Sequence, residues 1–420
     1  MSNSFTPLTT IQGMSVAELN KFVAQRDVII WGGGHLGRVI KQSIEKYGLS
    51  VKYFCDSNPK LQGKVIDDVS IISPTSAIEE ALKRNAILII ASILYRDDIQ
   101  SHCHSAGLKL KTHYILYLHI SRPEAQVEIS DKSNSPMSSP INIMQQHTYE
   151  KVLNKLLSDL PLLSHIRLSA WGDPMLNPEL PKIIELTEKK VPCTIMTNLH
   201  TTNNLRAIIN ASPSQFVVTI DRSNSSPKDK QCTFNMQTLD KNLNILSNLI
   251  KEIEPSTEFK VMYLIYQDNQ GKEQKEIKAL CSNLGLKFVS SMAYLSPYEK
   301  ILQYCEGEQL SADDYEIQQN LAWNLDQALA LSRKDQSSPC LCQRIFPIIN
   351  WDLSISLCEV YFGPKIADNY LDVTFNDLLK LRHGNQHCRK CQSHSLHRLD
   401  IDVLRRRYPT ENLFLFERES

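Results

Sequence analysis

The sequence lacks the features that tie a chain to a membrane or to a polyanion. No apolar run reaches the roughly 18 residues that a membrane-spanning helix needs. Neither sign of charge is in excess, because Lys and Arg number 46 and so do Asp and Glu. The first stretch, MSNSFTPLTTIQG, has neither the basic start nor the hydrophobic core of a signal peptide. We therefore expect a cytoplasmic protein without a membrane span and without a nucleic-acid partner.

Cysteine is present, but it is unevenly distributed. Of the 11 cysteines in 420 residues, five fall between Cys340 and Cys391. In a cytoplasmic chain such a cluster favours a metal site over disulfides. The remaining ones are expected to be small core residues, and they are Cys55, Cys103, Cys193, Cys232, Cys281 and Cys305.

The N-terminal part has the pattern of a nucleotide-binding domain. A short buried strand (28–31) runs into a G-x-G-x-x-G sequence and a helix, and a second strand (51–55) ends in an acid. The glycines let backbone N–H groups approach a phosphate at the helix N-terminus, and the acid is placed to hold a ribose hydroxyl. A packing module without a ligand is the alternative reading. The residues predicted to bind the nucleotide are Gly32, Gly34, Gly37 and Asp56.

The segment from Phe54 to Ile66, together with Ile71-Ile-Ser-Pro74, resembles a "D-x-x-P-x-x-Q-G-K … I-x-S-P" segment of small Rossmann-like modules. Such modules precede sugar acyltransferases and some sugar-processing methyltransferases. The resemblance covers about residues 25 to 118. It implies a small-molecule ligand, NAD or a nucleotide-sugar, and a place in sugar or surface-polysaccharide metabolism.

Strands and helices alternate again in the central part. Residues 166–170 and 191–196 read as strands, and the helix between them has apolar residues at helical spacing. Polar residues follow both strands, at the ends that carry ligand sites in parallel α/β folds. Further strands are expected at 215–220, 259–265 and 287–289, with helices at 239–253 and 272–284. The central part is therefore predicted to be an α/β domain with parallel strands.

The segments GDPMLNPEL and TIMTN closely resemble the GEP-x-LNP-x-L and TN segments of radical SAM enzymes. The resemblance implies a partial (β/α)6 barrel of the radical SAM type. It also implies that Gly172, Asp173 and Asn198 lie where those enzymes receive S-adenosylmethionine.

The cysteine motif of that family, CxxxCxxC after the first barrel strand, is absent. Asp131-Lys-Ser-Asn-Ser-Pro-Met-Ser138 stands there instead, so Ser133, Ser135 and Ser138 replace the thiolates. Hydroxyls ionise too weakly to hold a [4Fe–4S] cluster. Binding of S-adenosylmethionine is accordingly doubtful, and inherited scaffolding is the favoured reading of the Gly172 turn.

The C-terminal part combines C-x15-C, from Cys342 to Cys358, with the C-x2-C of Cys388 and Cys391. This spacing resembles the SPASM extension of radical SAM enzymes, with Leu353 at a position that the family fills with Gly. It implies that these four cysteines hold one auxiliary [4Fe–4S] cluster. Zinc on the same four thiolates is the alternative, and Cys340 can replace Cys342.

Three domains are expected: a Rossmann-like domain (1–120), a radical-SAM-like barrel (121–300), and a helical bridge followed by a SPASM-like domain (301–420). Two functions remain open. One is a binding or partner protein that has an auxiliary cluster and a nucleotide-binding domain and that acts with another protein. The other is an active S-adenosylmethionine-dependent oxidoreductase or maturase with non-standard cluster ligands. The missing CxxxCxxC motif favours the first.

Overall fold

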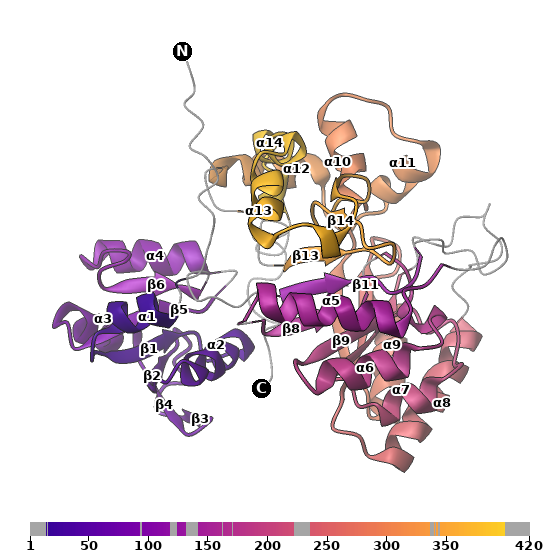
Figure 1. The fold of residues 1–420 in the computed structure, drawn as a ribbon. Helices are drawn as coiled ribbons and strands as arrows, with labels where there is room; N and C mark the ends of the chain where they lie inside the picture. The colour runs from indigo at the N-terminus through magenta and orange to yellow at the C-terminus, as the bar shows by residue number, and fades with distance from the viewer. Residues whose placement is uncertain are drawn as a thin grey trace. The chain divides into compact units, whose positions relative to one another are not determined.

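The computed structural model describes residues 14, 16–92, 95–117, 124–131, 142–161, 163–169, 171–221, 236–336, 340, 342 and 345–399. They fall into two compact units, one within residues 9–122 and the other within 123–403. Each unit is an α/β structure built on its own sheet (Figure 1).

The N-terminal unit is a six-stranded sheet in the order β3-β4-β2-β1-β5-β6. All neighbours are parallel except β3 and β4. Its strands are β1 (Asp27–Trp31), β2 (Val51–Cys55), β3 (Val65–Ile66), β4 (Val69–Ile72), β5 (Ala86–Ile90) and β6 (Tyr114–Leu116). Its helices are α1 (Val16–Val23), α2 (His35–Lys46), α3 (Pro74–Leu82) and α4 (Arg96–Ser105).

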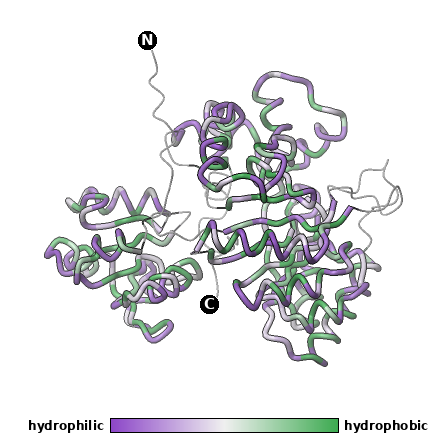
Figure 2. The backbone as a smooth tube through the Cα atoms, in the orientation of Figure 1, coloured by the Kyte–Doolittle hydropathy of each residue, from purple (hydrophilic) through white to green (hydrophobic). Residues whose placement is uncertain are grey.

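The strand order of this sheet reverses beside β1. The chain leaves β1 for β2 and β4 on one side, and then crosses to β5 and β6 on the other. Every residue of β5 is apolar and buried, as expected of a central strand in a parallel sheet (Figure 2). The carboxyl ends of β1 and β5 therefore diverge into connections on opposite sides, the place where open parallel sheets bind ligands.

The second unit is a nine-stranded sheet in the order β12-β11-β10-β9-β8-β7-β13-β14-β15. The strands β7 to β12 follow one another in the chain and are all parallel. They are β7 (Glu124–Val127), β8 (His165–Arg167), β9 (Cys193–Thr197), β10 (Gln215–Ile220), β11 (Glu258–Ile265) and β12 (Lys287–Met292). The helices between them are α5 (Gln146–Asp159), α6 (Leu180–Glu188), α7 (Leu205–Asn210), α8 (Met236–Ile253) and α9 (Lys272–Leu284).

The last part of the chain extends this same sheet. β13 (Ile345–Ile349) pairs parallel with β7, and β14 (Ile355–Ser356) and β15 (Lys365–Ala367) follow antiparallel. The expected helical bridge consists of three short helices, α10 (Tyr298–Cys305), α11 (Ala312–Gln319) and α12 (Leu325–Ser332). Two more helices, α13 (Phe375–His383) and α14 (Gln386–Ser393), carry the chain to the end of the described residues.

The predicted elements are largely confirmed, and β10 and α9 have the expected bounds. The expected strand at 166–170 is shorter, because the pairing of β8 ends at Arg167. Helix α7 was not expected, since six residues are too few to show helical periodicity.

Side chains of the parallel strands alternate between an apolar set and a polar set. The polar set includes residues that the strand registers place side by side, and these are Gln126, Arg167, Thr194, Gln215 and Glu258. Hydrogen bonds run along this row from His165 through Thr194 and Gln215 to Glu258, which also pairs with Lys287. These side chains therefore stabilise the sheet by hydrogen bonds and an ion pair that join neighbouring strands.

Candidate functional site

The glycine loop of the N-terminal unit is tight at two of its three predicted positions. Gly32 has φ +123°, and a Cβ there would lie 2.5 Å from the carbonyl oxygen of Ala91. A Cβ on Gly37 would lie 1.9 Å from the carbonyl oxygen of Gly32. Both positions therefore require glycine for close backbone approach. Gly34 is the N-cap of α2 and has an ordinary extended backbone.

Asp56 lies against this loop. Its Oδ2 accepts a hydrogen bond of 3.2 Å from the backbone N–H of Gly33, and its Oδ1 accepts one of 2.8 Å from Asn58. The structure thus brings together the glycines and the acid that the sequence predicts. Because Asp56 is half-buried, its remaining lone pairs face outward and can accept from a ligand hydroxyl.

Sequence reasoning missed two residues at the carboxyl end of β5. Ser92 is 5% exposed and accepts a hydrogen bond from the backbone of Tyr95. Arg96, at the start of α4, is 2% exposed. The pairing of β1 with β5 places Ser92 near the end of β1, and a local sequence pattern carries no information about that pairing.

In the second unit, the Gly172 turn packs directly on the segment after β7. A Cβ on Gly172 would lie 2.5 Å from the carbonyl oxygen of Asp131 and 2.7 Å from that of Ser130. The Oε1 atom of Glu128, a residue that is 1% exposed, accepts from the backbone N–H groups of Trp171 and Gly172 at 3.1 and 2.8 Å. Glu128 is a third residue that the sequence analysis did not predict, because its hydrogen-bond partners lie more than 40 positions away in the chain.

Both carboxylate oxygens of Asp173 accept hydrogen bonds from groups of the protein itself. Its Oδ1 accepts from the N–H of Met175 at 3.0 Å, and its Oδ2 accepts from the hydroxyl of Thr197 at 2.8 Å. Burial raises the pKa of this carboxyl, and the hydrogen bonds from Met175, Thr197 and Asn198 oppose that rise. Asn198 lies beside it and accepts from the N–H of His200. The three predicted residues Gly172, Asp173 and Asn198 therefore come together, while Ser133, Ser135 and Ser138 lie outside the described residues.

The predicted cysteine ligands come from three segments that are far apart in the chain. Cys342 precedes β13, Cys358 follows β14, and Cys388 and Cys391 lie one helical turn apart on α14. The C-x2-C sequence is thus on a helix and not on a tight turn, but spacing of three still puts both thiols on one helix face. Cys342 interacts with Cys340 and Cys358, and both Cys388 and Cys391 interact with Cys340 and Cys358. Cys340 therefore belongs to this group of five thiols.

The thiols stand in surroundings that disfavour their charged form. Burial raises the pKa of Cys388 to about 12 and that of Cys391 well above its usual range. The pKa of Cys342 is raised first by hydrogen bonding with Cys340. Among the described residues, which include all five of these cysteines, no group of three or more Cys, His, Asp or Glu side chains is arranged so that it could hold a metal ion. Binding of a cation would require these side chains to converge, and its positive charge would then stabilise the thiolates.

One short segment links these cysteines to the parallel strands of the second unit. We call residues 359–363 the crossing segment. Glu359 pairs with Arg167 of β8 at 3.3 Å, and the ring of Phe362 meets that of Trp171 edge to face at 5.5 Å. On its other side, the carbonyl of Val360 accepts from Tyr298 and the N–H of Gly363 donates to Glu299. The segment thus joins the region of β8 to the start of α10.

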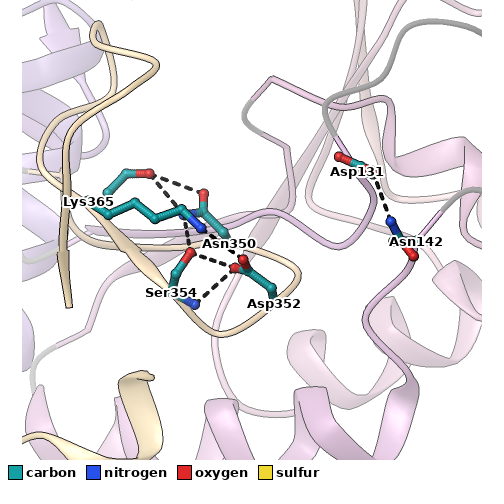
Figure 3. Close-up of polar contacts among 7 residues, drawn as sticks. Asp131, Asn142, Asn350, Asp352, Ser354 and Lys365 are labelled. Carbon is teal, nitrogen blue, oxygen red and sulfur yellow. Dashed lines mark hydrogen bonds and ion pairs between the residues drawn. The ribbon is translucent and has the colours of Figure 1, made fainter. Parts of the chain in front are cut away.

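The turn between β13 and β14 contains the Leu353 that stands at the expected glycine position. Leu353 has φ +69°, the left-handed conformation that glycine adopts most readily. The turn is held by Asn350, by Asp352 with Ser354, and by the ion pair of Lys365 with Asp352 at 2.9 Å (Figure 3). A hydrogen bond between Asn142 and Asp131, in the connection that follows β7, is also drawn in Figure 3.

Among the described residues, no helix is both long and apolar enough to cross a bilayer.

No protein-family model matches the chain, and no curated protein matches its sequence. Solved structures with some similarity include native anSMEcpe with bound AdoMet and Kp18Cys peptide, at 14% identity over 66% of this chain and 88% of that chain, with a TM-score of 0.38. Streptococcus suis SuiB bound to precursor peptide SuiA is 15% identical over 71% of this chain and 74% of that chain, with a TM-score of 0.39. Both are radical SAM/SPASM-type enzymes. RSP, a Rex-family repressor solved in complex with beta-NADH, is 30% identical over 22% of this chain and 49% of that chain, with a TM-score of 0.17.

Proposed function

We propose that the chain is a radical SAM/SPASM-type protein that holds one auxiliary [4Fe–4S] cluster and lacks the radical-generating cluster. The observation that carries the proposal is the approach of the cysteine-bearing segments: the ring of Tyr361, three positions after Cys358, packs on His387 of α14 at 6.4 Å, and the carbonyl of Cys342 accepts a 3.0 Å hydrogen bond from Arg382 of α13. Thiolates are soft ligands, which select iron–sulfur clusters or zinc over magnesium or calcium. The proposed ligands are Cys342, Cys358, Cys388 and Cys391, with Cys340 able to take the place of Cys342.

The role of the site follows from its ligand count. Four protein thiolates leave no open position on the metal for a substrate, so the bound cluster would supply structural stability or electron transfer. A metal bound by these residues would tie the segments before β13 and after β14 to α14. The part of the chain after residue 300 would then depend on metal for its stability, as small metal-centred domains do.

The barrel is proposed to act without radical chemistry. Ser133, Ser135 and Ser138 stand where three thiolates are needed. The carboxylate of Asp173 is used by Met175 and Thr197, which supports the reading of the Gly172 turn as scaffolding.

The N-terminal unit is proposed to be a Rossmann-like domain that binds a small-molecule nucleotide, NAD or a nucleotide-sugar. The reversal of strand order beside β1 supports this, because the glycine loop, Asp56 and Ser92 all lie at the ligand-binding ends of β1, β2 and β5. A function in sugar or surface-polysaccharide metabolism, a cytoplasmic location, a protein partner and the division at residues 120 and 300 are parts of the same proposal.

Iron and acid-labile sulfide per chain, measured after anaerobic reconstitution, test the central claim. We expect one [4Fe–4S] cluster per chain by EPR after reduction, and its loss in a Cys388→Ala, Cys391→Ala double variant. The matched control is Cys305→Ala, which removes a half-buried thiol outside the group of five. Stoichiometric zinc without iron in anaerobically purified protein would overturn the iron–sulfur assignment.

A further inference from the structure

The amino ends of three neighbouring strands in the N-terminal unit gather positive charge. Strands β1, β5 and β6 are parallel, so the loops that lead into them lie at one edge of the sheet. Two hydrogen bonds join these loops. The N–H of Asp27 donates to the carbonyl of Asn85 at 2.9 Å, and the Nη1 atom of Arg26 donates to the carbonyl of Thr112 at 3.2 Å. We call the cations of these loops the basic edge, and they are Arg26, Arg84, Lys109 and Lys111.

No acid balances the basic edge within the part of the chain that the structure describes. Two acids accompany these loops, but each has a lysine of its own. Asp27 pairs with Lys52 at 2.5 Å, and Glu80 pairs with Lys83 at 3.7 Å. Among the described residues, no ion pair involves a member of the basic edge. The edge therefore has a local excess of positive charge, although the whole chain has none.

A histidine beside the basic edge experiences this positive charge. His113 directly precedes β6, and its Nδ1 atom accepts a 3.0 Å hydrogen bond from the N–H of Lys109. Burial lowers the pKa of His113, and the charges of Arg84, Lys109 and Arg26 lower it further. Cations that repel one common neighbour lie close together, so the basic edge is a single patch.

Two exposed leucines lie within this patch. Leu110, between Lys109 and Lys111, is 37% exposed, and Leu82, two positions before Arg84, is 47% exposed. Exposed apolar side chains among charged ones are a feature of protein-binding surfaces. A small anion would not contact the leucines, whereas an acidic protein surface with an apolar side chain of its own would bury them.

The second unit presents a helix of this kind. None of the eight residues of α11 is buried, and its Tyr315 is 57% exposed. The helix is held by its Ser311 cap and by the ion pair of Asp314 with Lys300 at 2.6 Å, and it lies at the margin of its unit (Figure 1). Helices this short gain most of their stability from packing, so α11 has an outer face that a partner can cover.

The charge around α11 is opposite to that of the basic edge. From residue 301 to residue 332 the chain contains six acids and no Lys, Arg or His. Two of these acids pair with cations from outside that range, Asp314 with Lys300 and Glu306 with Lys390. The acids that are exposed and in no ion pair with a described residue are Glu308, Asp313 and Glu316. Tyr315 thus lies among acids as the leucines lie among cations.

We propose that α11 of one copy of this chain docks on the basic edge of a second copy. The two surfaces have opposite charges, and each has exposed apolar side chains among its charged ones. Two copies can exchange this contact reciprocally, each giving its α11 and receiving the other's, which closes a dimer. The basic edge is at the amino ends of the strands, so docking leaves free the carboxyl ends, where the nucleotide is proposed to bind. The inference does not depend on a metal at the cysteines.

Charge reversal in the full-length chain, followed by sedimentation velocity, tests the inference. We expect wild type to dimerise. The double variants Arg84→Glu, Lys109→Glu and Asp313→Lys, Glu316→Lys should each raise the dissociation constant by roughly tenfold or more, because like charges then face each other. An equal mixture of the two variants should associate again, since the reversed surfaces are complementary. A chain with all four reversals should dimerise for the same reason.

The matched control is Lys275→Glu, Lys278→Glu on α9, which changes the net charge by the same amount at exposed positions of the second unit. Its dissociation constant should equal that of wild type. A wild type that stays monomeric up to its solubility limit would overturn the inference, and so would a dimer that survives both reversals.

Salt dependence of wild type tests the same contact without any substitution, in case a reversed variant does not fold. Raising the salt from about 50 mM to about 500 mM screens exposed charges, so the dissociation constant should rise by roughly tenfold. A dimer whose dissociation constant does not change with salt would show that these charges do not hold it, and the inference would fail.

Discussion

The hydroxyl of Thr197 donates a hydrogen bond of 2.8 Å to the Oδ2 atom of Asp173. Thr197 is the last residue of β9, and Asp173 lies in the turn that follows the neighbouring strand β8. The same hydroxyl accepts from the N–H of Leu199 at 3.0 Å. The resemblance to radical SAM enzymes implies that this carboxylate binds S-adenosylmethionine. In the structure its hydrogen bonds join the turn after β8 to the end of β9. The contribution of these hydrogen bonds to the free energy of unfolding can be measured.

Replacing Thr197 with Val should lower the free energy of unfolding by about 1–3 kcal/mol, because a carboxylate oxygen then stays buried without its donor. Urea titration would show this as a lower midpoint with unchanged slope. Thr201→Val is the control, since Thr201 accepts one backbone hydrogen bond but faces no buried carboxylate. If Thr197→Val lowers the free energy of unfolding no more than Thr201→Val does, the hydrogen bond between Thr197 and Asp173 does not stabilise the fold.

The raised pKa of Asp173 predicts a pH dependence of stability. Its folded pKa lies above the ordinary value of 3.8, so the folded state holds the proton more tightly than the unfolded state. This contribution is complete below pH 3.8 and is lost as the pH rises through the folded pKa. As the pH rises through that window, the unfolding free energy of wild type should therefore fall relative to that of Asp173→Asn. A difference that is constant with pH would contradict the burial argument.

Leu353 should be a site where glycine is better than alanine. Both substitutions remove the side chain, but Ala keeps the strain of φ +69° and Gly does not. We expect Leu353→Gly to be more stable than Leu353→Ala by about 1 kcal/mol. The comparison Leu379→Gly with Leu379→Ala, inside α13, should give the opposite order. Equal stabilities of the two Leu353 variants would show that the turn relaxes.

The barrel should not cleave S-adenosylmethionine reductively. Reconstituted protein with dithionite should form no 5′-deoxyadenosine above a control without enzyme, because three serines cannot hold the cluster that donates the electron. Liquid chromatography with mass spectrometry gives the readout. Product above the control would favour the alternative of an active oxidoreductase with ligands of another kind.

The N-terminal unit should bind a nucleotide through the glycine loop. Calorimetry of the full chain with NAD(H), NADP(H) and UDP-sugars should detect one ligand, and Asp56→Asn should weaken it by roughly tenfold through loss of a charged acceptor. Lys60→Ala, on the exposed loop after β2, is the control. The absence of binding by every one of these nucleotides would leave the packing-module reading.

The sequence by itself determined the local structure and the chemical inventory. Periodicity fixed α9 and β10, because burial of one face repeats with the period of the element. The glycine positions were also readable, since Gly32 and Gly37 meet backbone atoms that no Cβ can approach. The cysteine spacing identified the candidate metal ligands, whereas the positive φ of Leu353, which stands where the SPASM pattern has Gly, is a finding of the structure.

The tertiary structure decided which of these residues meet. Ala91 approaches Gly32 only because β1 and β5 are neighbours, and Glu128 accepts from the Gly172 turn only because β7 and β8 are neighbours. The segment after Cys358 reaches α14, where Tyr361 packs on His387, only through the path of the chain around β13 and β14. Contacts of this kind depend on sheet order and crossing connections, and a local pattern of residues carries no information about either.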